Sequence, residues 1–332
     1  MTSAGGNGGE GPASAGECGP RSKGATSPGA LSADAWRSVL RRVVRHVVSD
    51  RLMVQSAGVA FFALLSIAPV LVTAISVYGA VHTPEQALAQ LSDVTEMLPS
   101  ELQPMVADQL TTITTASTQV LTWRGLAGLV VALWTATTAM TYLVDGLTLA
   151  YHETETRSFL RRGGLALLLV LGSAVLLGAV IAGSGAVSRW LAGAPGPVRA
   201  GAPALTWGVL ALLMAVVLAI LYRFGPDRKQ ARWRWISTGS AIATLLWLAV
   251  TFGLFAYVEQ LGSYRATYGS LAGVAISMLW LWATVFLVIV GAAINAETER
   301  QTTCDSTVGP ERPLGERGAV VADSAPPYPG DG

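Results

Sequence analysis

Residues 265–297 read RATYGSLAGVAISMLWLWATVFLVIVGAAINAE, and no Asp, Glu, Lys or Arg stands between the two ends of this stretch. An α-helix rises about 1.5 Å per residue, so about 20 apolar residues cross the hydrocarbon core of a bilayer. The stretch is long enough to do so. It therefore predicts a membrane-spanning helix over residues 269–294.

The same pattern recurs five more times along the chain. The 332 residues are 52% hydrophobic and 13% charged, whereas soluble domains average about 25% charged residues. The charged residues cluster between long apolar intervals, and only Asp145 interrupts one of them. We therefore predict an all-α, polytopic membrane bundle with six transmembrane helices, approximately over residues 57–81, 125–150, 164–187, 203–222, 236–257 and 269–294.

The basic residues predict the orientation of this bundle. With the N-terminus inside, 18 of the 22 Lys and Arg residues fall on the inner side, and four fall outside: Arg124, Arg189, Arg199 and Arg265. The positive-inside rule then places both termini in the cytoplasm. A net charge of +1 provides no electrostatic case for nucleic-acid binding. The expected partners are membrane lipids.

Both ends of the chain differ in composition from the predicted membrane domain, residues 32–301. Residues 1–31 and 302–332 are rich in small and polar residues, and such segments bury too little apolar surface to fold. We expect two disordered cytoplasmic tails. Cys18 and Cys304 lie in these tails, where unpaired thiols are the expected state.

Three segments outside the spans show amphipathic or basic patterns. Residues 32–55 place apolar side chains on one helical face and arginines mainly elsewhere, which favours a helix in the cytoplasmic interface; binding of nucleic acid or a protein partner is the alternative. Two capping patterns in residues 82–123 predict short amphipathic helices over the outer mouth, with a solvated acidic connection as the alternative. Arg and Trp residues of 225–235 predict an anchor at headgroup depth.

Small residues repeat every four positions in three spans. Such faces let helix backbones approach closely within a bilayer. We expect packing seams inside the bundle, with a homodimer contact as the alternative. The residues are Gly128, Ala132 and Ala136; Ala174, Gly178, Ala182 and Ala186; and Gly269, Gly273 and Ser277.

Polar residues within the first two spans are candidates for function. Pro69, near Ser66, removes a backbone donor at mid-depth, which suits either a cavity lining or helix packing. Thr135, Thr138, Tyr142 and Asp145 share one helical stripe. An Asp near the centre of a span costs about 2.5–3.5 kcal/mol. Asp145 is thus either a structural ion pair with Arg157, Arg161 or Arg162, or part of a substrate or proton path. We predict such a pair, bordering a polar cavity that faces the first span.

Motifs for catalysis are missing from the sequence. It contains no HExxH, CxxC, GxSxG or phosphate-binding GK[ST] loop, and its three histidines are far apart. A hydrolytic metal centre needs several convergent ligands. We therefore predict neither a metal nor a cofactor, and no enzyme activity.

Three stretches carry a resemblance to a known family. They are AGVAFFALLSIAPVLV (57–72), VDGLTLAYHETETRSFLRRGGLALLL (144–169), and YRFGPDRKQARWRWISTGSAIATLLWL (222–248) continuing to the stretch that ends at Arg300. Over roughly residues 40–300 the chain resembles the YihY/virulence factor BrkB membrane proteins, sometimes labelled ribonuclease BN. One departure is Thr148, where the family usually has Asn. The matching motif positions include Tyr151, Glu155, Asp227, Arg228, Tyr264, Tyr268, Gly269, Ser270, Asn295 and Glu297.

The resemblance implies six spans and two cytoplasmic ends, in agreement with the charge distribution. It also implies a multi-pass protein of the bacterial plasma (inner) membrane. The function we expect is a transporter or a translocator of lipids or envelope precursors. A membrane-embedded hydrolase and a non-transporting envelope scaffold are the alternatives.

Overall fold

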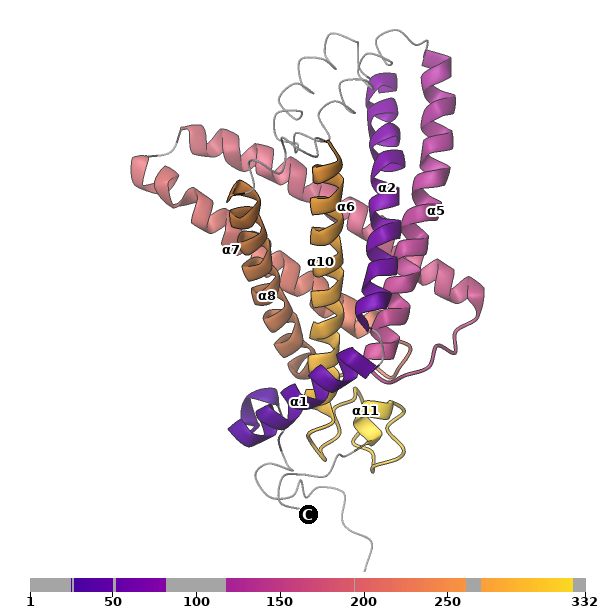
Figure 1. Ribbon diagram of the computed structural model, residues 1–332, viewed down its shortest axis with the longest axis vertical. Helices are drawn as coiled ribbons and strands as arrows, with labels where there is room; N and C mark the ends of the chain where they lie inside the picture. The colour runs from indigo at the N-terminus through magenta and orange to yellow at the C-terminus, as the bar shows by residue number, and fades with distance from the viewer. Residues whose placement is uncertain are drawn as a thin grey trace, which may run out of the picture.

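The computed structural model describes residues 25, 27–49, 52–81, 118–193, 195–260 and 270–324, and Figure 1 shows their arrangement. Within these ranges the chain is all-α, as predicted. The long helices are α1 (Ala33–Ser49), α2 (Leu52–Val81), α5 (Thr118–Ala150), α6 (Phe159–Ala192), α7 (Gly196–Phe224), α8 (Trp233–Gln260) and α10 (Ser270–Glu299). Two short elements are η1 (Pro28–Ala30) and α11 (Val320–Asp323).

Among the described residues, six helices are long and apolar enough to cross a membrane, which confirms the predicted number of spans. The spanning segments are Leu52–Val70, Gly125–Ala150, Phe159–Val180, Gly201–Phe224, Trp233–Val258 and Gly273–Glu299. Five of the six helices begin before the apolar segment predicted for them, because backbone hydrogen bonding continues past the hydrocarbon-length stretch. The two helices predicted within residues 82–123 lie outside the described residues, apart from the start of α5.

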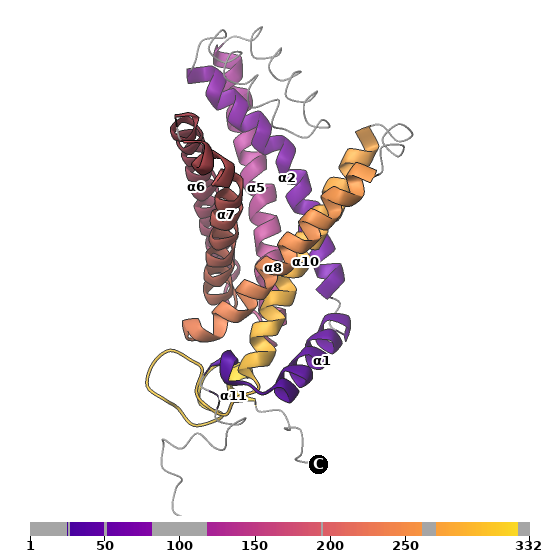
Figure 2. The same ribbon diagram turned by 90° about the vertical axis from the view of Figure 1, so that its left-hand side faces the viewer.

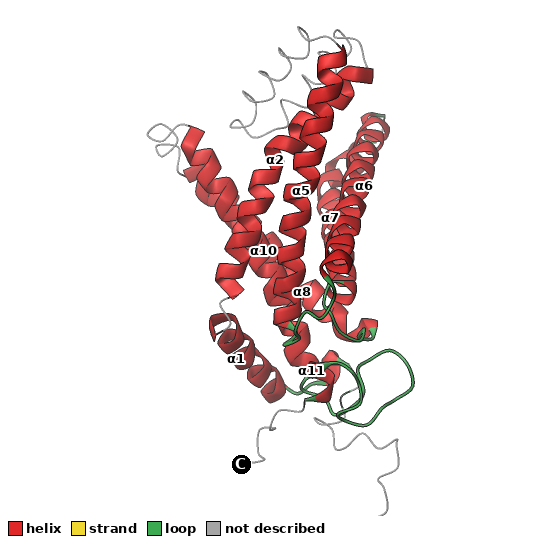
Figure 3. Cartoon of the chain, turned by 90° about the vertical axis from the view of Figure 1, so that its right-hand side faces the viewer, coloured by secondary structure: helices red, strands yellow, loops and turns green. Residues whose placement is uncertain are grey.

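Helix α10 is central to the bundle. It packs against α8, α2, α5 and α1, while α2 runs along α5, and α6 and α7 pack against α5 and α8. Figures 1 and 2 show α1 and α11 together at one end. Most of the described loops gather there too (Figure 3). We call this the charged end: α1, the loops 151–158 and 225–232, and the segment 300–324.

The hydrophobic core lies toward the charged end. Leu147, Leu218 and Ile289 are at most 2% exposed and belong to one cluster. Helix α10 is almost fully buried from Val288 onward, whereas its residues 274–284 are all half-buried or exposed. The helices therefore converge at the charged end and pack less closely beyond it.

A close glycine crossing between α8 and α10 forms part of this core. A Cβ built on Gly239 would lie within 3.0 Å of the Gly291 carbonyl oxygen and of the Asn295 side chain. The Asn295 amide accepts from Gly239 N–H at 2.7 Å and donates to the Ile236 carbonyl at 3.0 Å. The small-residue seam predicted on α6 differs, because a Cβ on Gly178 would meet nothing within 4 Å. At Gly178 this face therefore packs against no other helix in the described part of the chain.

The disorder predicted for the C-terminal tail does not hold for residues 302–324. Backbone bonds join this segment to the loop 225–232, from Arg232 N–H to Ser306 O at 2.8 Å and from Val308 N–H to Gln230 O at 3.0 Å. Arg317 donates to the Thr303 and Ala322 carbonyls at 2.6 and 2.9 Å. Backbone pairing and one buried arginine thus order a segment with few large apolar residues.

The remaining terminal predictions have mixed outcomes. Residue 25 and residues 27–31 are described, and Ala25 and Leu31 are buried against Ala35 and Trp36. Residues 1–24 and 325–332 lie outside the described residues. Cys304 is disulfide-bonded, contrary to the expected unpaired thiol, while Cys18 lies outside the described residues.

Candidate functional site

Helix α10 ends at the charged end with two buried carboxylates. The side chains of Glu297 and Glu299 are each 1% exposed. Residues two positions apart point to nearly opposite sides of an α-helix, so the two carboxylates reach different neighbours. Burying an unpaired carboxylate is very unfavourable, and each has a cationic partner.

Glu297 connects three separate elements. Arg42 of α1 donates to Glu297 Oε2 at 2.6 Å and to Gln301 Oε1 at 2.7 Å. His152, in the loop after α5, places Nε2 at 2.9 Å from Glu297 Oε1, and Arg300 donates to the same oxygen at 3.2 Å. His152 has a φ of 57°, a left-handed conformation that is uncommon for a non-glycine residue. The bond to Glu297 is one contact that holds this turn.

Glu299 pairs with the loop between α7 and α8. Arg228 donates to both carboxylate oxygens, at 2.9 and 2.6 Å, and the Arg228 side chain is 2% exposed. The guanidinium also stacks 4.9 Å from the centre of the Tyr151 ring. Burial would lower the pKa of Arg228, but the Glu299 charge outweighs it and raises that pKa. Burial also raises the pKa of Tyr151, so its phenol stays protonated.

A third contact joins the two loops directly. Asp227 accepts the Thr156 backbone N–H at 2.8 Å and its hydroxyl at 2.6 Å, and Arg157 Nε lies 3.2 Å from Asp227. Arg157 also donates to the Gly225 and Pro226 carbonyls and lies beside Glu155. Burial alone would raise the pKa of Asp227, but the Thr156 bonds and the Arg157 charge lower it below its usual value.

The ion-pair partner of Asp145 is Arg162 in the first turn of α6. The loop 151–158 reverses the chain, so α6 runs back beside α5. Arg157, named beforehand as a candidate partner, instead pairs with Asp227. Both Asp145 and Arg162 are partly exposed, at 23% and 29%.

The polar stripe on α5 is largely bonded within its own helix. Thr135 and Thr138 donate to the carbonyls of Val131 and Trp134, at 2.9 and 2.8 Å. Tyr142 stacks on Phe62 of α2, with ring centres 5.4 Å apart. On α2, Ser66 donates to the Ala63 carbonyl at 2.7 Å, and the helix continues through Pro69. The polar cavity predicted beside this stripe remains a prediction.

Most of the motif positions named from the resemblance gather at the charged end. They are Tyr151, Glu155, Asp227, Arg228, Asn295 and Glu297. Tyr264, Tyr268 and Gly269 lie outside the described residues, and Ser270 begins α10.

Sequence reasoning missed Arg42, His152 and Glu299. One signal was present for Arg42, which follows the periodicity of Val39 and Val43 on the buried face of α1. An arginine on an apolar face needs an anionic partner. The predicted headgroup anchor is corrected for two of its residues, because the Arg228 side chain and Trp235 are buried, each at 2% exposure. Trp233 is 51% exposed and Arg234 is also exposed, so for them the anchor stays a prediction.

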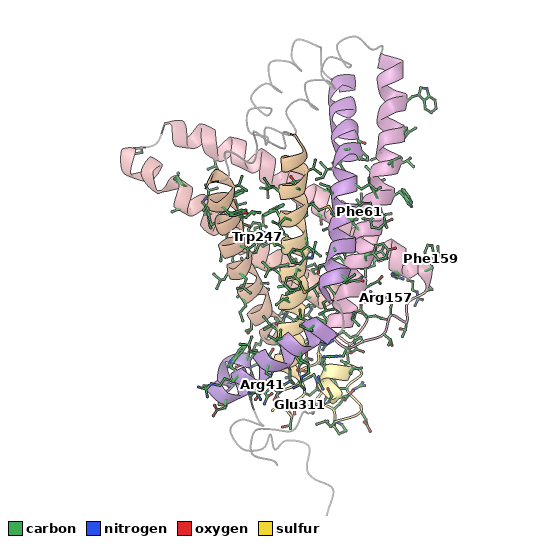
Figure 4. All side chains as sticks on the ribbon, viewed as in Figure 1. Arg41, Phe61, Arg157, Phe159, Trp247 and Glu311 are labelled. Atoms are coloured by element: carbon green, nitrogen blue, oxygen red, sulfur yellow. The ribbon has the colours of Figure 1, made fainter. Side chains whose placement is uncertain are left out.

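The chemistry of the site is that of charge pairing between elements. Within the described ranges no three His, Cys, Asp or Glu side chains converge to hold a metal ion. The three carboxylates tie α1, both loops and α10 to one another, while Asn295 ties α10 to α8. Figure 4 shows Arg157 and Arg41 in this part of the molecule. The arrangement can hold the helices together at one end and release them if its pairs separate.

Comparison with known proteins finds relatives that are named as membrane proteins. A "Putative ribonuclease-like protein YfkH" of Bacillus subtilis is 28% identical over 250 residues, 73% of this chain and 88% of that protein. UPF0761 membrane proteins of Ralstonia nicotianae and Methylibium petroleiphilum are each 25% identical, over 78% and 79% of this chain. The chain spans 58% and 62% of their lengths. No solved structure matches. The Virulence factor BrkB profile matches residues 43–314, and the chain therefore belongs to this family of membrane proteins.

Proposed function

We propose that this protein is a transporter that moves a lipid or an amphiphilic envelope precursor across the bacterial inner membrane. The charged end is its gate, closed in this structure and facing the cytoplasm. The observation that carries the proposal is the unequal packing of the two ends. Burial and bridging ion pairs concentrate at the charged end, whereas residues 274–284 of the central helix α10 stay half-buried or exposed.

Alternating access requires one end of a bundle to close while the other is open. A bundle that serves only as a scaffold has no such requirement and gains stability by burying its central helix along its whole length. The presence of two partly exposed pairs also fits a gate. Arg42–Glu297 and Arg157–Asp227 each have an arginine about one-fifth exposed (20% and 19%), so water can replace their contacts on opening.

The buried pair Arg228–Glu299 has a different role. Both side chains are at most 2% exposed, and separating a buried pair costs about 3–5 kcal/mol. We assign it to a permanent joint between α10 and the loop 225–232. The opening movement then carries α1 and the loop 151–158 away from α10. The Asp145–Arg162 pair joins α5 to α6 beside the moving loop and stays closed.

Reconstituted vesicles containing a fluorescent phospholipid test the proposal. The chain should accelerate exchange of the label between leaflets, measured by chemical quenching of the outer leaflet. Arg42→Gln combined with Glu297→Gln removes the gate contacts of Glu297 and should increase the rate. The partners that remain, His152 and Arg300, are each about one-quarter exposed (27% and 26%), so no buried charge is left unpaired. The matched control is Asp34→Asn with Arg37→Gln, an exposed pair on α1 (72% and 79%) of the kind that contributes only about 0.2–1 kcal/mol.

Equal rates in protein-free, wild-type and gate-variant vesicles would refute lipid transport. Hydrolysis of the labelled lipid or of RNA by the purified chain would favour the hydrolase alternative. Orientation is tested separately, by cysteines placed at 226–232. These should react with an impermeant reagent only after the cells are permeabilised, and reaction in intact cells would place the charged end outside.

A further inference from the structure

An apolar groove lies between α1 and the pair of helices α8 and α10. Helix α1 lies on the side toward which α8 and α10 lean (Figures 2 and 3), and a groove of about 730 Å³ remains between them. Three stripes of apolar residues at spacings of four line it: Leu40, Val44 and Val48 of α1; Ile242 and Leu246 of α8; and Phe286, Val290 and Ile294 of α10. Ligand sites typically have volumes of about 300–1,000 Å³.

The α1 side of this groove is unusually exposed for apolar residues. Leu40, Val44 and Val48 are 61%, 57% and 70% exposed. The neighbouring apolar stripe of α1, Val39, Val43 and Val47, is buried and lines the inner side of the same groove. The outer side of the groove is therefore left open by the fold itself, while α1 is held in place by its buried valines and by the Arg42–Glu297 pair.

A cationic stripe runs beside the exposed apolar one. Arg41 and Arg45 each follow a groove residue by one position, and both are exposed. Arg37 continues the stripe but is already paired with Asp34 at 2.8 Å, and Arg42 is committed to Glu297. Arg41 and Arg45 have no ion pair among the described residues. An apolar channel beside two available guanidinium groups matches an amphiphile with an anionic head.

We propose that the groove binds one anionic phospholipid of the surrounding bilayer, with an acyl chain between α1 and the α8–α10 pair and the phosphate at Arg41 and Arg45. Guanidinium groups bind phosphate oxygens in a bidentate manner. An interfacial amphipathic helix holds its apolar face at the level where acyl chains meet headgroups. This proposal does not rest on transport, because the groove is present in this closed structure and its lipid would be a bound component whether or not α1 moves away from α10.

Photo-crosslinking of the full-length protein in lipid nanodiscs tests the site. The probes are phosphatidylglycerol and phosphatidylcholine that carry the same photoreactive acyl chain, and labelled peptides are mapped by mass spectrometry. Phosphatidylglycerol should label residues 40–48 and 286–294 preferentially. Arg41→Gln with Arg45→Gln should reduce the preference for phosphatidylglycerol about thirtyfold (about 2 kcal/mol, at about 1 kcal/mol for each arginine near an anionic surface).

Two matched controls make the result specific. Arg161→Gln with Arg234→Gln removes two exposed arginines from the first turns of α6 and α8 and should leave the preference unchanged. Val44→Trp fills the groove and should abolish labelling of 286–294 by either lipid, whereas Val209→Trp, at an exposed site on α7 (55%), should not. Equal labelling by the two lipids in the wild type, or labels spread evenly over α7 and α10, would overturn the proposal. Crosslinks from a second copy of the chain in the groove would overturn it in favour of a dimer interface.

Discussion

The glycine crossing of α8 and α10 makes a sharp stability prediction. Gly239→Ala places a methyl group within 3.0 Å of the Gly291 carbonyl oxygen and the Asn295 side chain. The Gly291 oxygen belongs to the backbone of α10, which cannot rotate out of the way as a flexible side chain can. The helices must separate, or Asn295 must give up its 2.7 Å bond to the Gly239 N–H.

The expected cost follows from these contacts. Adding a methyl group to a packed contact costs about 1–3 kcal/mol, and losing a buried hydrogen bond adds about 1–3 kcal/mol. Alanine offsets about 1 kcal/mol of this, because it favours a helix more than glycine does. The net destabilisation is about 1–5 kcal/mol. At about 2–4 °C per kcal/mol, the midpoint of thermal unfolding should fall by roughly 10 °C.

The measurement is thermal unfolding of the detergent-solubilised protein, followed by tryptophan fluorescence and by size-exclusion chromatography of heated samples. Gly253→Ala is the matched control, because it lies on the same helix and its Cβ would meet nothing within 4 Å. It should unfold at the wild-type temperature or slightly higher. If Gly239→Ala unfolds at the same temperature as Gly253→Ala, the close crossing is wrong.

A second substitution tests the same crossing from α10. In Gly291→Ala the new methyl group meets the Tyr222 hydroxyl and the Ala243 Cβ. Tyr222→Phe removes the hydroxyl, so the double variant should recover part of the stability that Gly291→Ala loses. Full additivity of the two losses would contradict this contact.

Three further predictions concern the charge pairs. Glu299→Gln should destabilise the fold by about 3–5 kcal/mol and so lower the folded yield, because it leaves the Arg228 charge buried without a partner. Arg228→Met with Glu299→Met should recover the yield. No recovery would contradict a purely structural role for the pair. Asp145→Asn should likewise lose yield that Arg162→Gln restores, whereas Arg157→Gln should not restore it. Asp227 has a lowered pKa in the folded state, so its ionised form adds stability above its ordinary pKa of about 3.9 and loses that contribution as the pH falls through the folded value. The stability difference between wild type and Asp227→Asn should therefore shrink below about pH 4, and a difference that grows in acid would refute the sign.

The sequence by itself determined the number of spans and the helical class. Long apolar intervals indicate both features. The bilayer core has a nearly constant thickness, which sets the length of a span, and every backbone polar group within it must be hydrogen-bonded inside its own helix. The amphipathic pattern of α1 was likewise visible, since its apolar positions repeat with the helical period. The predicted spans differ from the observed helices mainly in where they begin, because most of the helices extend beyond the segment that crosses the hydrocarbon core.

Only the tertiary structure decided which charged groups meet. Arg42 and Glu297 are 255 residues apart, and nothing local to either residue specifies the other. Three arginines follow Asp145 within a short distance in the sequence, and the direction of the turn at 151–158 selected Arg162. The C-terminal segment was expected to be disordered because it lacks an apolar core, yet its backbone pairs with the loop 225–232. Local patterns report what a residue requires from its surroundings, but its actual partner depends on how the helices cross.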